Sequence, residues 1–136
     1  MKIVNAYPPN IEQIRAVLTP PANTVFTYGD TIYAPGIALP LSQDLIVHEE
    51  VHEKQQYGGI DPGFINPADW WMAYLVDKTF RFEQEVAAYQ AQYKYFRANN
   101  SRNVSRQFAR TIAKDLSGVM YGNIVDFTKA LEVIKS

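Results

Sequence analysis

Between Thr79 and Ala98, apolar side chains recur at alternating intervals of four and three residues, with polar side chains at most positions between them. The members of this stripe are Phe82, Val86, Tyr89, Tyr93 and Phe96. An α-helix brings such positions onto one face, because one turn takes about 3.6 residues. The segment therefore predicts a long amphipathic helix whose apolar stripe packs against a core.

A different pattern occurs between Thr24 and Ala34. There, β-branched and aromatic residues alternate on both sides of Gly29-Asp30. A glycine next to an aspartate is typical of the tight turn that joins two antiparallel strands. Pro35-Gly36 ends the second strand. We therefore expect a β-hairpin here.

The segment 42–57 predicts a second helix. Ser42 is a suitable N-cap, and Gly58-Gly59 is a suitable stop. Four side chains are expected to form its apolar face: Leu45, Ile46, Val47 and Val51. A loop is expected from Gly58 to Asn66, before the next helix begins.

The remaining helices are predicted from their boundary residues and from shorter apolar patterns. Asn66-Pro67-Ala68-Asp69 begins a helix that breaks near Asp77, just before the helix over 79–98. The other predicted helices cover 11–18, 104–116 and a C-terminal segment that starts at Asp126.

The composition agrees with one globular domain over residues 1–136, since 47% of the residues are hydrophobic and 20% are charged. We predict an α+β fold that is mostly helical, with about five helices and one small antiparallel sheet. The net charge of -1 gives no general attraction to nucleic acid or to an anionic membrane. The chain shows no apolar run of membrane-spanning length and no signal-peptide core, so we expect a cytoplasmic protein, with association with a virion also open.

Both histidines of the chain lie in the sequence His48-Glu49-Glu50-Val51-His52, which has the pattern H-E-x-x-H. Residues four apart lie on the same face of a helix, so the two imidazoles can bind one zinc ion. Glu49 follows the first ligand directly and is placed to take a proton from water at the metal. The pattern therefore predicts a catalytic zinc site.

A catalytic zinc ion usually has three protein ligands and keeps a fourth position for water. The chain has no third histidine and no cysteine, so the third ligand must be an acidic residue. Glu83 and Glu85 both lie on the predicted helix over 79–98. Glu85 borders the apolar stripe, because it comes three residues after Phe82 and four before Tyr89, whereas Glu83 points more toward solvent. We predict Glu85 as the third ligand, with Glu83 as the alternative.

Other residues are candidates for contacts with a substrate. The negative oxygen that develops during acyl transfer needs a second donor besides the metal, and Tyr121, beside Gly122 in a predicted loop, is the candidate. The hairpin before the H-E-x-x-H helix offers either a strand that pairs with an extended substrate or a purely structural element. Trp70, Trp71 and Tyr74 belong either to the core or to the wall of an apolar subsite.

These residues resemble the gluzincin clan of metallopeptidases, in which the third ligand is a glutamate on a later helix, often within Glu-x-x-Ala-Asp. Here His48-Glu49-x-x-His52 is followed by Glu85-x-x-Ala88, and Tyr89 stands where the aspartate would be. The chain is also similar to minimal gluzincins and to small H-E-x-x-H proteins of bacteria and phages. The resemblance implies a zincin-like core, in which a small sheet precedes two metal-bearing helices.

The predicted function is hydrolysis of peptide bonds by water at a Zn²⁺ ion, with Glu49 as general base and a peptide or protein as substrate. The alternative is a zinc-binding structural or interaction protein without catalytic activity, for example a component of a phage or mobile element. A structural zinc site does not need a base, so Glu49 favours the catalytic reading.

Overall fold

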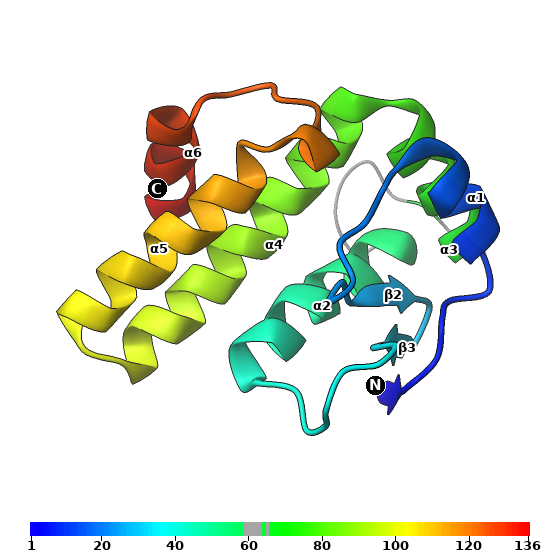
Figure 1. Cartoon of the computed structure of the whole chain (residues 1–136), viewed down its shortest axis with the longest axis horizontal. Coiled ribbons are helices and arrows are strands. Elements are labelled where there is room, and N and C mark those ends of the chain that lie inside the picture. Colours follow the sequence, from blue (N-terminus) through cyan, green and yellow to red (C-terminus); the bar gives the residue numbers. More distant parts are fainter. Residues whose placement is uncertain (59–63, 65) are drawn as a thin grey trace.

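Six α-helices and a three-stranded sheet make up most of the computed structural model, which describes residues 1–58, 64 and 66–136 (Figure 1). The strands are β1 (Lys2–Val4), β2 (Phe26–Tyr28) and β3 (Thr31–Tyr33). The helices are α1 (Ile11–Val17), α2 (Gln43–Gln56), α3 (Pro67–Val76), α4 (Lys78–Asn99), α5 (Arg102–Leu116) and α6 (Phe127–Lys135), with one 3₁₀ helix, η1 (Val119–Tyr121). The prediction of a mostly helical α+β fold is confirmed.

The predicted hairpin is confirmed, since β2 pairs with β3 in antiparallel fashion, with Thr27 opposite Ile32. Gly29 makes the turn with a φ of +64°, a conformation that glycine adopts at little cost. The sheet is nevertheless mixed and not purely antiparallel, because β1 adds to β3 in parallel, with Ile3 opposite Ile32. Strand β1 has only three residues, which are too few to show an alternating pattern in the sequence.

The helix boundaries follow the predicted signals closely. Among the described residues, four side chains cap the backbone N–H groups of their helices: Asn66 on α3, Asp77 on α4, Ser101 on α5 and Asp126 on α6. Each of the six helical segments predicted one by one is found, so the total among the described residues is six and not about five. Helix α5 begins at Arg102, two residues earlier than expected. η1 was not expected. Most of the loop predicted over 58–66 lies outside the described residues.

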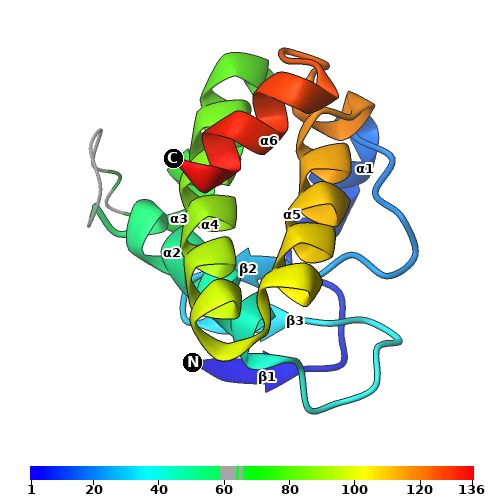
Figure 2. The ribbon, with the colours of Figure 1, turned by 90° about the vertical axis from the view of Figure 1, so that its left-hand side faces the viewer.

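Helix α4 lies in the middle of the molecule and separates two groups of elements. It packs against α5 and α6 on one side and against α2 and α3 on the other (Figures 1 and 2). On the first side, Tyr89 and Tyr93 join an apolar cluster with α5 and α6, as the predicted stripe requires. On the other side, α3 and α1 form a second apolar cluster with β2 around Trp70 and Ile14. Within the described parts of the chain, no helix is long and apolar enough to cross a lipid bilayer.

The face that α2 buries is polar, in contrast to the predicted apolar face. Leu45 and Ile46 pack only partly, against a small cluster beside the sheet, and Val47 and Val51 are also only partly buried. The buried residues of α2 are His48, Glu49, His52, Gln55 and Gln56. Three of them, His48, His52 and Gln55, contact a polar stripe on α4 that contains Gln84, Glu85 and Gln92. The other two, Glu49 and Gln56, make hydrogen bonds to Thr27 of β2, and Gln56 also bonds to Gly29 in the turn after it. We call the five residues of α2 and the three of α4 the polar layer between α2 and α4.

Arg81, at the start of α4, connects this helix to two other parts of the chain. Its buried guanidinium donates hydrogen bonds to the backbone oxygens of Tyr74, Leu75 and Met120. Tyr74 and Leu75 lie in the last turn of α3, and Met120 lies in η1. The planar, forked shape of an arginine head group suits several acceptors at once. Arg81 therefore holds η1, and with it Tyr121, against α3 and α4.

We expect Arg81→Lys to lower the free energy of unfolding by about 2 kcal/mol, because lysine cannot reach all three carbonyl groups and leaves buried acceptors without a donor. Urea unfolding followed by circular dichroism measures this change. Arg102→Lys, at an exposed position of α5, is the matched control and should stay within about 0.5 kcal/mol of the wild type. Equal stability of the Arg81→Lys variant and the control would contradict the bridging role.

Candidate metal centre

Two imidazoles and one carboxylate meet between α2 and α4. Nε2 of His48 lies 3.1 Å from Oε1 of Glu85, and Nε2 of His52 lies 3.2 Å from the same oxygen. The three side chains are buried, with 5%, 5% and 4% of their residue surfaces exposed. One ligand atom from each lies within 4.8 Å of the others, so the three can share one metal ion.

The structure thus brings Glu85 to the histidines, as predicted, and leaves the alternative residue outside. Glu83 is exposed on α4 and does not contribute to the cluster. The reason is the helical spacing: Glu85 shares its face of α4 with Ala88 and Gln92, which are buried toward α2.

Each imidazole is enclosed in the same way, by an amide at Nδ1 and an aromatic ring. His48 Nδ1 lies 2.9 Å from Oε1 of Gln92, and the ring of Tyr89 stands edge-on at a centroid distance of 4.6 Å. His52 Nδ1 lies 2.8 Å from Oε1 of Gln55, and the Trp70 ring lies at 5.4 Å. The ring of Tyr89 is therefore a wall of the site.

The second carboxylate oxygen of Glu85 is held by Tyr74, whose hydroxyl donates to Oε2 at 2.5 Å. Burial alone would raise the pKa of Glu85, but the neighbouring His52 and His48 lower it well below its ordinary value. Burial would lower the pKa of His52, but the Glu85 carboxylate outweighs this effect and raises that pKa to about 9. Glu85 is therefore ionised and ready to bind a cation.

Glu49 is also buried but has a different environment. Its Oε1 accepts a hydrogen bond from the Thr27 hydroxyl at 2.9 Å, while Oε2 lies 3.7 Å from Nε2 of His48. Burial raises the pKa of Glu49, and the nearby histidines offset this only in part. A raised pKa makes the carboxylate a stronger base, which is better suited to accept a proton from water.

A cavity of about 530 Å³ reaches these residues from outside. Its inner wall contains His48, Glu49, His52 and Glu85, and its outer walls include 18–21 and 118–121. Trp70 and Trp71 are buried in the second apolar cluster, as the core reading expects, and both also line the cavity.

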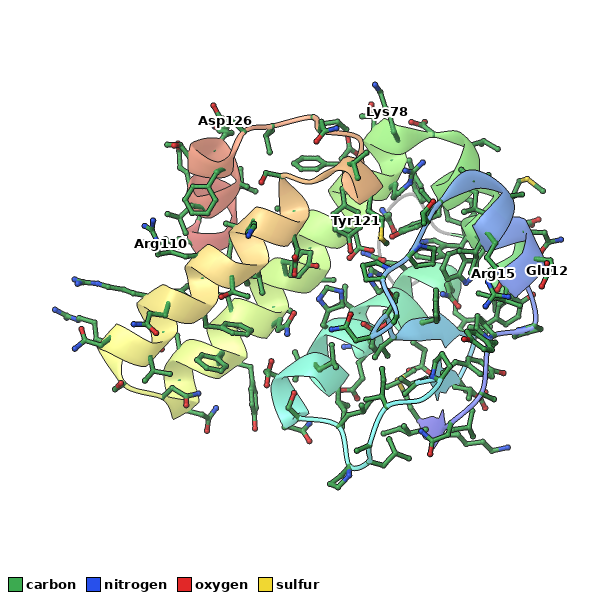
Figure 3. The ribbon with its side chains drawn as sticks, in the orientation of Figure 1. Glu12, Arg15, Lys78, Arg110, Tyr121 and Asp126 are labelled. Atoms are coloured by element: carbon green, nitrogen blue, oxygen red, sulfur yellow. The ribbon has the colours of Figure 1, made fainter. Side chains whose placement is uncertain are left out.

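Tyr121 lines the same cavity from η1 and extends toward α4 (Figure 3). Its hydroxyl oxygen lies 3.4 Å from that of Tyr89. Burial raises the pKa of Tyr121 well above its ordinary value, so the hydroxyl keeps its proton and can donate it in a hydrogen bond.

The backbone carbonyl of Thr27, the middle residue of β2, has a structural role. The backbone oxygen of Thr27 accepts hydrogen bonds from Nε2 of Gln56 at 2.8 Å and from Nε1 of Trp71 at 3.0 Å. A substrate chain could not pair with this carbonyl without displacing both donors. Of the two readings of the hairpin, the contacts favour the structural element over the substrate-pairing strand.

Sequence reasoning missed Gln55, Gln92 and Thr27 as neighbours of the site, and it named Tyr74 for the core or an apolar subsite but not as the hydrogen-bond partner of Glu85. Two of them had a signal: Gln55 lies seven residues after His48, and Gln92 lies seven after Glu85, which places each on the ligand face of its helix. Tyr74 and Thr27 come from other elements, and no local spacing relates them to the motif.

Two imidazole nitrogens and a carboxylate oxygen form a ligand set that suits a zinc ion. No protein-family model, no curated protein and no solved structure matches the chain. The chemistry of the site is therefore argued from its own geometry.

Replacement of Glu85 by Gln should lower the affinity for a divalent metal at least 100-fold, because the substitution removes the only carboxylate of the three-residue cluster. Titration of the metal-free protein with Zn²⁺ in a calorimeter measures the affinity. Glu83→Gln removes an equal charge from the exposed face of the same helix and should bind like the wild type. Equal affinities of the two variants would rule out Glu85 as a ligand.

Proposed function

We propose that the protein is a zinc-dependent peptidase, as the likeness of its motif to gluzincins suggests. The observation that carries the proposal is the position of Glu49. Its carboxylate is buried, held at one oxygen by Thr27, and lies beside the three ligand side chains in the wall of a cavity. A site that only stabilised the fold would need neither a free carboxylate nor access for a substrate.

His48, His52 and Glu85 would hold the metal. Within the described residues, the cluster offers three ligand side chains, the number typical of catalytic zinc sites. Zinc bound there would polarise the carbonyl of the scissile peptide and make a water molecule acidic near neutral pH. Tyr74 holds the carboxylate of Glu85 in place, so that one oxygen remains directed at the histidines.

Glu49 moves the proton in this scheme. It accepts a proton from water as the water oxygen attacks the peptide carbonyl carbon. The C–N bond then breaks, and Glu49 returns the proton to the departing amine nitrogen. The products are a carboxylic acid and an amine, and Glu49 regains its charge. The Thr27 hydroxyl keeps the carboxylate oriented by its hydrogen bond to Oε1.

Tyr121 supplies a hydrogen bond to the carbonyl oxygen as negative charge develops on it. Its protonated hydroxyl lies in the same cavity, and Arg81 fixes η1 through Met120. A hydrogen-bond donor that is already in position stabilises the developing negative charge more than water does, because it need not reorient during the reaction. The apolar side chains of Phe26 and Trp71 line the cavity and would receive substrate side chains.

Glu49→Gln should keep zinc and reduce kcat about 10²- to 10⁴-fold, because the amide cannot accept the proton from water. Cleavage of a random peptide library, read by mass spectrometry, measures activity, and elemental analysis measures zinc. Glu50→Gln changes the next residue and should leave both values unchanged. Undiminished cleavage by Glu49→Gln would show that Glu49 is not the base.

Tyr121→Phe should reduce kcat about 10²-fold with little change in KM, because the lost hydrogen bond acts chiefly in the transition state. The folded structure should tolerate the change, since the ring remains to pack against the cluster around Tyr89. Tyr7→Phe, at an exposed position far from the motif in sequence, is the control. A change confined to KM would assign Tyr121 to substrate binding alone.

A further inference from the structure

The two glutamines at the histidines are each held at their far end by a group that can only accept hydrogen bonds. Nε2 of Gln92 donates to Oδ2 of Asp44 at 2.9 Å. Asp44 lies in the first turn of α2, one turn before His48. An ionised carboxylate has no proton to donate, so the amide must present its NH₂ group to Asp44 and its oxygen to His48.

The second glutamine is fixed in the same direction by the backbone. Nε2 of Gln55 donates to the backbone oxygen of Gln84 at 3.0 Å, and a carbonyl oxygen can only accept. The Gln84 side chain cannot replace that acceptor, because its own oxygen accepts from Nε1 of Trp70 at 2.8 Å. The oxygen of Gln55 is therefore directed at His52.

A hydrogen bond between an amide oxygen and an imidazole nitrogen requires the proton on the nitrogen. Both histidines must then carry a proton on Nδ1, so Nε2, next to Glu85, is the nitrogen whose lone pair is free for a metal ion once the imidazole is neutral. We propose that Gln55 and Gln92 are positioning residues that fix this tautomer and direct both Nε2 atoms at the metal. This inference rests on the metal centre of the proposed function but not on hydrolysis.

The two chains of hydrogen bonds differ at their ends, and this difference permits a specific test. The chain to His48 ends on the carboxylate of Asp44, whereas the chain to His52 ends on a peptide carbonyl. Only the first can be rebuilt by substitution, because both of its outer members are side chains. In the double variant Asp44→Asn/Gln92→Glu, the glutamate accepts from Nδ1 of His48 and the asparagine donates to the glutamate. The order of donors and acceptors is thus restored with the same net charge.

The experiment compares zinc-loaded wild type with Gln92→Met, Gln55→Met and the double variant, and uses Gln90→Met as matched control. Gln90 is a partly buried glutamine of α4 that donates to the backbone oxygen of Val133 and does not contact the site. Zinc affinity is measured by competition with a chelator. Proton–nitrogen NMR of ¹⁵N-histidine protein reports the imidazole nitrogens without overlap, since the chain has only 2 histidines.

We expect two protected Nδ1–H signals and two zinc-bound Nε2 atoms in the wild type. Gln92→Met should lose protection of the His48 signal alone, Gln55→Met of the His52 signal alone, and each should bind zinc about 10- to 100-fold more weakly. The double variant should recover both the His48 signal and most of the affinity. If the methionine variants do not fold, the double variant still tests whether the residue at position 92 positions His48.

Three results would overturn the inference: zinc bound through Nδ1, unchanged signals and affinities in both methionine variants relative to Gln90→Met, or a double variant no better than Gln92→Met. If the wild type takes up no zinc, the metal centre itself is wrong and the inference falls with it. If the wild type binds zinc in the predicted manner but cleaves no peptide, only the hydrolytic proposal fails, and the positioning role of the two glutamines stands.

Discussion

The polar layer between α2 and α4 is the constraint on which the arrangement of the molecule depends. A buried polar or charged group costs several kcal/mol unless it finds a hydrogen-bond partner, so α2 and α4 can approach only in a register that pairs these groups. No fully buried side-chain polar atom of this layer lacks a partner: among the described residues, such atoms belong to Asn10 and Ser105, which lie elsewhere. The helix pair is therefore specified by hydrogen-bond geometry more than by apolar contact.

The stability of the fold must then come from the elements around this layer. The apolar cluster of α4, α5 and α6 covers one side, and the cluster of α1, α3 and β2 covers the other. These clusters also limit the contact of the side chains between them with water to the cavity that reaches them. Exclusion of water strengthens the attraction between Glu85 and the histidines and raises the pKa of Glu49. The burial that makes the layer costly therefore strengthens the ion pairing of Glu85 with the histidines and makes Glu49 a stronger base.

Helix α4 connects the polar layer to the apolar core and to η1. One face carries Tyr89 and Tyr93 to the apolar cluster, and the neighbouring face carries Glu85 and Gln92 to α2. Its first turn holds η1 through Arg81. A rotation of α4 would disturb the core, the ligand cluster and the position of Tyr121 together. This coupling explains how a small chain can hold side chains from seven of its described elements at one cavity.

The sequence by itself determined the helices, the hairpin and the identity of the cluster, because helical spacing and capping are local properties. The spacing of His48 and His52 placed both on one face, and the position of Glu85 beside the apolar stripe distinguished it from Glu83. Only the tertiary structure decided that the buried face of α2 is polar, that β1 joins the sheet, and that Thr27 and Tyr74 hold the two carboxylates. These contacts join residues 11 to 44 positions apart in the chain. No local pattern encodes them, because the cost of burying a polar group depends on which partner the packing of distant elements brings to it.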